Sequence, residues 1–103
     1  MEKIKIDYKW HDNWASQNSQ EGSSHNEIAI DSKGLIYVSF SVEPYLRVFN
    51  DAGDLLFTSN LCGPNMHSLF ISKDSEGEFL WNIDVVSNIL TKSTLEGEVI
   101  QSI

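Results

Sequence analysis

Two stretches of the chain decide its fold: Leu35-Ile36-Tyr37-Val38 and Phe79-Leu80-Trp81-Asn82, which match each other 44 positions apart. Gly53-Asp54-Leu55-Leu56 matches Gly97-Glu98-Val99-Ile100 at the same spacing. Because one spacing recurs over two separate stretches, the 103-residue chain contains a tandem repeat, and a repeat of this length determines the architecture.

The apolar residues of each repeat alternate or form short runs between Gly, Asp, Asn and Ser, which is typical of strands and not of helices. This pattern predicts four strands in each repeat. They are expected at Glu27–Asp31, Leu35–Phe40, Tyr45–Asn50, Asp54–Ser59, Ser68–Ser72, Phe79–Asp84, Asn88–Thr94 and Glu98–Ile103. Alternation of Ile4, Ile6, Tyr8 and Trp10 predicts one further strand near the N-terminus.

Repeated four-stranded units of about 40 to 45 residues have the size of β-propeller blades. We therefore expect an all-β fold of two four-stranded antiparallel blades plus an N-terminal strand. The expected boundaries are 1–24 for the N-terminal strand and a polar loop, 25–66 for the first blade and 67–103 for the second. Closed propellers have about 4 to 8 blades, so two blades leave two blade faces uncovered.

Two arrangements would cover these faces. Either the remaining blades of a longer protein complete a partial propeller, or three identical chains close a six-bladed ring. The N-terminal strand favours the first arrangement. Each repeat already holds four strands, so a ninth strand is surplus to a self-contained trimer.

Both repeats resemble blades of one known family. The resemblance is carried by His67–Ile71, Gly77–Asp84 and Lys92–Ile100 in the second repeat, and by His25–Val38 and Arg47–Leu56 in the first. These segments are similar to blades of NHL-type six-bladed propellers, which include peptidyl-hydroxyglycine amidating lyase and its bacterial relatives. The resemblance implies six blades around an axial channel. It leaves the activity open, because such propellers serve as enzymes, RNA-binding proteins and protein-binding platforms.

His67 and His25 stand just before the first strand of their repeats. In the lyases that the chain resembles, histidines at this blade position hold a catalytic zinc, and neutral imidazole is a suitable ligand. The resemblance therefore implies His67 and His25 as metal ligands, with zinc or calcium as the metal. Their registers differ by one residue, which would turn them to opposite faces. A catalytic zinc takes about three protein ligands, so this chain alone is not expected to be catalytic.

Asp84 and Trp81 are the other candidate binding residues. Asp84 ends an apolar strand, where its carboxylate could face the channel or orient a histidine, although in the resembling propellers such an aspartate joins neighbouring loops. Trp81 matches Tyr37, and both rings are expected to pack between blades. Arg47 is expected on the surface, and Asp31 in a turn with its side chain bonded to the backbone.

Charge and composition limit the partners. Fifteen acidic residues against seven basic ones give a net charge of -8, which disfavours contact with nucleic-acid phosphates. The apolar runs are far shorter than the roughly 20 residues that span a bilayer. The N-terminus alternates charge with isoleucine where a secretory signal has a continuous apolar core, and Cys62 is the single cysteine. We therefore expect a cytoplasmic protein without nucleic-acid or membrane partners.

Two functions stay open at this point. The first is a lyase-like propeller that holds a metal, a small molecule or a peptide at the axial channel through His67. The second is a non-enzymatic scaffold that binds a protein, a peptide or a glycan. Tyr8, Trp10 and Trp14 could form an aromatic platform for a glycan, but packing against another blade is the favoured role.

Overall fold

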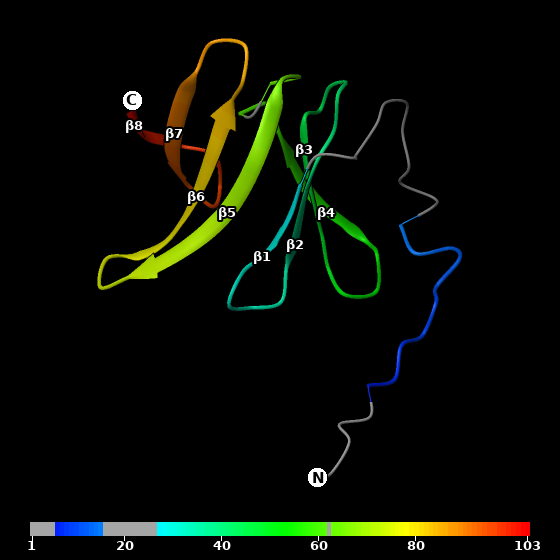
Figure 1. Cartoon of the computed structure of the whole chain (residues 1–103). Coiled ribbons are helices and arrows are strands. Elements are labelled where there is room, and N and C mark those ends of the chain that lie inside the picture. Colours follow the sequence, from blue (N-terminus) through cyan, green and yellow to red (C-terminus); the bar gives the residue numbers. More distant parts are fainter. Residues whose placement is uncertain (1–5, 16–26, 62) are drawn as a thin grey trace, which may run out of the picture.

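The computed structural model describes residues 6–15, 27–61 and 63–103, and these contain two four-stranded antiparallel sheets (Figure 1). The first sheet consists of β1 (Ile28–Ile30), β2 (Ile36–Ser39), β3 (Leu46–Phe49) and β4 (Leu55–Ser59). The second consists of β5 (Met66–Asp74), β6 (Gly77–Asp84), β7 (Ile89–Thr94) and β8 (Val99–Ser102). Strands neighbour each other in chain order in both sheets. The all-β class and the eight repeat strands are confirmed.

Residues 6–10 do not form the predicted N-terminal strand. They run away from both sheets (Figure 1) and are absent from both strand orders, while Ile6, Tyr8 and Trp10 are exposed. A strand needs a neighbour for its N–H and C=O groups, and alternation alone does not supply one. The prediction is therefore wrong for this described part. Residues 1–5 lie outside the described residues.

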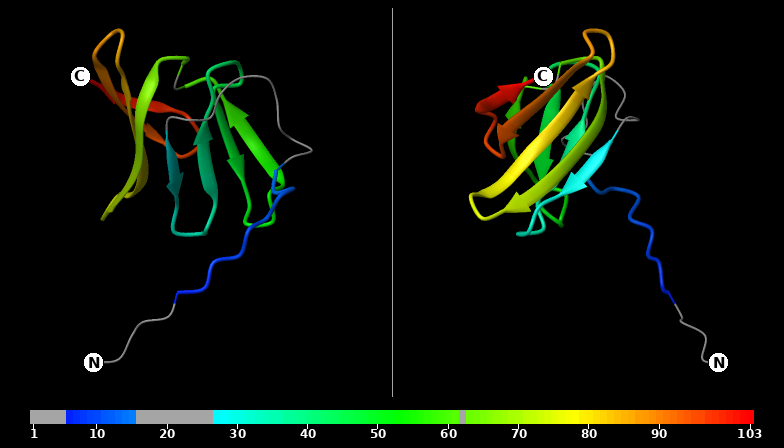
Figure 2. Two further views of the ribbon diagram at one scale, coloured as in Figure 1. Left: turned by 45° about the vertical axis from the view of Figure 1, so that its right-hand side comes forward. Right: turned by 60° about the vertical axis from the view of Figure 1, so that its left-hand side comes forward.

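The hydrophobic core lies between the two sheets, which face each other (Figure 2). Strand alternation turns one face of each sheet inward, and the inward side chains form a single cluster. Its fully buried members are Ala29, Tyr37, Leu46 and Val48 from the first sheet and Met66, Leu69 and Leu80 from the second. The two repeats are therefore held together by apolar side chains that are buried between the two sheets. In the described chain no helix is long and apolar enough to cross a membrane.

One hydrogen bond recurs at the same place in both repeats. The Tyr37 hydroxyl donates to Asp31 Oδ2 at 2.9 Å, and the Trp81 indole N–H donates to Ser72 Oγ at 2.9 Å. Each bond joins the second strand of a sheet to the end of its first strand. Asp31 Oδ1 also accepts from the backbone N–H groups of Lys33 and Leu35, which confirms its predicted turn role. The two sheets therefore share this hydrogen bond as well as their strand order.

Tyr37 is expected to make the free energy of unfolding fall as the pH rises in the alkaline range. Burial, and then the hydrogen bond to Asp31, raise the pKa of the Tyr37 hydroxyl above its ordinary value. The folded state therefore holds this proton more tightly than the unfolded state, so stability falls as pH rises above about 10. Urea unfolding at about pH 8 to 11 should show a steeper decline for the wild type than for Tyr37→Phe. Tyr8→Phe, at an exposed site, is the control, and equal slopes for all three proteins would contradict the assignment.

Candidate functional site

His67 and Asp84 lie at the same end of the second sheet. Met66, the first residue of β5, pairs with Asp84, the last residue of β6. The register shifts between Met66 and Ser68, which places His67 in a β-bulge. A bulged residue has no partner of its own across the ladder, and its side chain is turned away from the regular direction. His67 is exposed, so its imidazole is accessible from this end.

Asp84 holds the β6–β7 turn in place. Its Oδ1 accepts hydrogen bonds from the backbone N–H groups of Val86 and Ser87, each at 2.9 Å. The hydrogen bond from Ser87, followed by that from Val86, lowers the pKa of this carboxyl below its ordinary value. Oδ2 is directed toward Gly63, where an added Cβ would stand 3.9 Å from it. The carboxylate therefore holds its own turn, and it stays charged in neutral solution.

Three connections gather at this end of the sheets: 40–45 between β2 and β3, 60–65 between β4 and β5, and 85–88 between β6 and β7 (Figure 1). Two hydrogen bonds fix them. The Val85 N–H donates to the Asn65 carbonyl at 3.1 Å, and the Tyr45 N–H donates to Asn60 Oδ1 at 3.1 Å. We call the described residues of these connections, together with His67 and Asp84, the loop end.

Trp81 is separate from the loop end. Its ring stacks on Phe70, with centroids 6.1 Å apart and planes 5° apart, in the middle of the paired strands β5 and β6. Lys92 Nζ lies 5.4 Å from the centre of the Trp81 ring and 4.2 Å from that of Phe79. These residues are on the face of the second sheet that is turned away from the first. The structure therefore brings His67 and Asp84 to one end but leaves Trp81 on a free sheet face.

The predicted metal site is represented by His67 alone, because His25 lies outside the described residues. Within residues 6–15, 27–61 and 63–103, no group of three or more His, Cys, Asp or Glu side chains is placed to hold a metal ion. Further ligands for a metal at His67 would have to come from outside this set.

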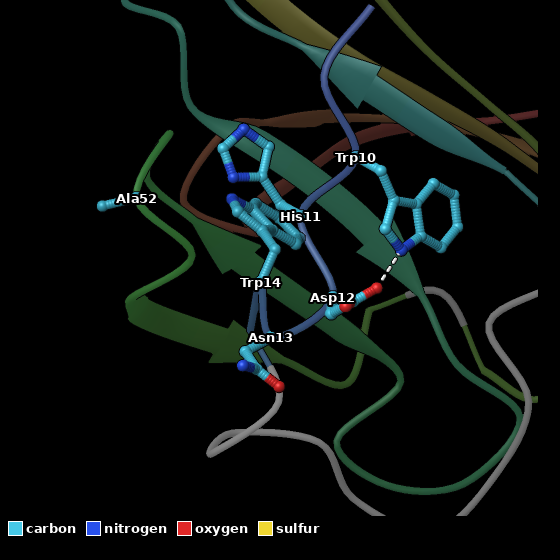
Figure 3. A pocket seen from close by; sticks show the side chains of 6 residues that line it. All are labelled: Trp10, His11, Asp12, Asn13, Trp14 and Ala52. Atoms are coloured by element: carbon cyan, nitrogen blue, oxygen red, sulfur yellow. Dashed lines mark hydrogen bonds between the residues drawn. The ribbon is translucent and has the colours of Figure 1, made fainter.

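The N-terminal segment forms an open hollow of about 430 Å³ (Figure 3). Its lining residues are Trp10, His11, Asp12, Asn13, Trp14 and Ala52. The Trp14 indole N–H donates to the Asp51 carbonyl at 2.8 Å, and its ring centroid lies 5.3 Å from that of Phe49. Gly53 permits this close approach, because a Cβ there would stand 2.6 Å from the Ala15 backbone nitrogen. Trp14 therefore packs on Phe49 of the first sheet.

Trp10 makes no comparable contact with either sheet among those that the structure gives. It is exposed, and its indole N–H donates to Asp12 within the same segment. Figure 3 shows the Trp10 ring turned away from Trp14 and His11, so the two indoles do not form one continuous platform. The aromatic glycan platform considered from the sequence is therefore not assembled in this arrangement.

Arg47 is buried, and the expectation of a surface position is wrong. Phe40 and Pro44 of the β2–β3 connection cover it: the guanidinium carbon lies 3.7 Å from the centre of the Phe40 ring, and Nε donates to the Pro44 carbonyl at 3.1 Å. Burial lowers the pKa of the guanidinium. Nη1 and Nη2 have no hydrogen-bond partner in the part of the chain that is described. Sequence reasoning missed this residue, because a single arginine in an alternating strand has the pattern of an exposed position.

Comparisons of the chain with known protein families, with curated protein sequences and with solved structures find no match. The NHL resemblance therefore rests on the residues of the two repeats.

Proposed function

We propose that the chain contributes two adjacent blades to a β-propeller that acts as a binding scaffold, with the loop end as its ligand site. The observation that supports this most strongly is that the boundaries of the sequence repeats coincide with those of the two sheets. Each repeat forms one four-stranded antiparallel sheet in chain order, and the Tyr37–Asp31 bond has its counterpart in Trp81–Ser72. Propellers are built by radial repetition of such sheets.

The innermost strands of this propeller would be β1 and β5. They are the first strands of their sheets, and they lie next to each other across the junction of the two repeats. In this arrangement the β-bulge would place His67 at the entrance of the axial channel, at the start of β5. A small molecule or a peptide that enters from the loop end would meet the exposed imidazole of His67 and the 63–65 backbone.

A metal-dependent, lyase-like activity is the second candidate, and exposed His67 favours it. The repeats resemble propellers in which histidines at this position bind zinc, and two more ligands would come from other blades. The scaffold is favoured for the described residues, because Asp84, the predicted partner at the same end of the sheet, already uses Oδ1 to hold its own turn.

Zinc titration distinguishes the two functions. Calorimetry of metal-free protein with ZnCl₂, at a concentration at which its mass shows that several blades are assembled, should show no zinc site that depends on His67 if the scaffold proposal is right. Zinc binding that weakens tenfold or more in His67→Ala would overturn it in favour of the lyase-like function, because one lost imidazole removes one of about three ligands. His11→Ala, an exposed histidine in the N-terminal hollow, is the matched control and should leave any His67-dependent zinc binding unchanged.

A further inference from the structure

Each sheet has one covered face and one free face. We call the free face of the second sheet the Trp81 face, and that of the first sheet the Ile28 face. The Trp81 face carries Phe70, Phe79, Trp81, Ile83 and Lys92, and the Ile28 face carries Ile28, Ile30, Ile36 and Val38. Phe70 is 47% exposed on the first of these faces, and Ile28 and Ile30 are 58% and 61% exposed on the second. Both faces therefore present large apolar side chains to solvent.

The repeat shows that the Trp81 face has a covered counterpart. Phe70 and Trp81 stand in the second repeat where Ala29 and Tyr37 stand in the first. The spacing is 44 for Tyr37 and Trp81 but 41 for the first strands, where Ile28-Ala29-Ile30-Asp31 matches Leu69-Phe70-Ile71-Ser72, because the turn between the first two strands is longer in the second repeat. Ala29 and Tyr37 belong to the covered face of the first sheet, which packs on the second sheet. The Trp81 face thus has the repeat positions of a face that is buried in the same chain.

The Ile28 face has a covered counterpart in the same way. Ile28 and Ile36 stand in the first repeat where Leu69 and Leu80 stand in the second. Leu69 and Leu80 form the covered face of the second sheet. The Trp81 face therefore corresponds to the covered face of the first sheet, and the Ile28 face corresponds to the covered face of the second sheet. These two covered faces pack against each other in the core of a single chain.

We infer that the chain associates with further copies of itself head to tail, with the Trp81 face of one copy packed on the Ile28 face of the next. The contact joins unlike faces, so it repeats the internal junction between the sheets and generates a ring or an open array. The inference rests on the blade arrangement of the proposed function, but not on its ligand site.

Charge placement favours this contact. The chain has fifteen acidic residues, yet Asp74, at the end of β5, is the one acidic residue that the strand registers place on either face. Lys92 is the one charged residue among those named above for the two faces, and its Nζ lies over the rings of Phe79 and Trp81, so cation–π contacts already engage its charge. Trp14 covers Phe49 on β3, which leaves β1 and β2 as the part of the Ile28 face that a second copy would contact.

Glutamate variants at one face each test the inference. Phe70→Glu disables the Trp81 face, and Ile30→Glu disables the Ile28 face; both sites are exposed, so circular dichroism should show an unchanged fold. Size exclusion with light scattering, at two concentrations, should give a wild-type mass that is a multiple of 11.7 kDa and a single-chain mass for each variant alone. An equimolar mixture of the two variants retains one intact face of each kind. It should therefore form a dimer and nothing larger.

Tyr8→Glu, at an exposed site in the N-terminal segment and outside both faces, is the control and should keep the wild-type mass. A wild-type protein that stays monomeric up to about 0.5 mM would overturn the inference, since even weak specific contacts have dissociation constants near or below this concentration. A mixture that stays monomeric, or a single variant that still dimerises, would overturn the head-to-tail pairing. Mass reports self-association, and the effect of His67→Ala on zinc binding reports the ligand site, so the two failures are distinguishable.

Discussion

Leu80→Ala is expected to lower the free energy of unfolding by about 2–5 kcal/mol. Leu80 is 0% exposed and lies in the cluster that joins the two sheets, so its truncation leaves a cavity where the repeats meet. A small domain has a total stability of only about 5–15 kcal/mol, so this one substitution removes a large share of it. Urea unfolding followed by circular dichroism measures the loss.

Ile36→Ala is the matched control, because Ile36 occupies the same repeat position as Leu80 but lies on the free Ile28 face. The expected loss is about 1 kcal/mol in a dilute, monomeric sample, since the side chain is only half-buried there. The loss should grow with protein concentration if copies associate through this face. Equal losses for Leu80→Ala and Ile36→Ala in dilute solution would contradict a core that lies on one side of each sheet.

The sequence predicts the sheets well, because strands and turns depend on local patterns. Every observed end of the eight strands lies within two residues of its prediction. Gly53 and Gly97 have φ of 89° and 104° in the β3–β4 and β7–β8 hairpin turns, a conformation that favours glycine. The turn role of Asp31 also follows from nearby residues. These features need only a few neighbouring positions to be specified.

The remaining features depend on contacts between distant segments, which alternation does not encode. All four residues of β3 are buried, and on its outer face two separate segments cause this. The β2–β3 connection covers Arg47, and Trp14 packs on Phe49. The apolar alternation of residues 6–10 has the pattern of a strand, but neither sheet pairs with it. The loop end also required the structure, because the bulge that singles out His67 arises from the pairing of β5 with β6.

Arg47→Met is expected to raise the free energy of unfolding by about 1–3 kcal/mol. Arg47 is 0% exposed, and Nη1 and Nη2 have no partner among the described residues. A buried donor without a partner costs about 1–3 kcal/mol, and replacing buried ionic groups by apolar residues of similar volume is often neutral or stabilising by about 1–4 kcal/mol. Methionine keeps an unbranched side chain that fills the same space. It gives up the contact with Phe40 and the hydrogen bond to Pro44, which offsets part of the gain.

Phe40→Leu separates these contributions, because it removes the ring below the guanidinium but leaves the buried charge in place. It should be destabilising by about 1 kcal/mol in the wild type and by less in the Arg47→Met background, where no cation faces the ring. Urea unfolding of the four proteins in this double-mutant cycle gives the coupling directly. A destabilised Arg47→Met protein would mean that Nη1 and Nη2 do have a partner in solution. In a chain with a net charge of -8, that partner would be sought first among the carboxylates of residues outside the described set or of a second copy.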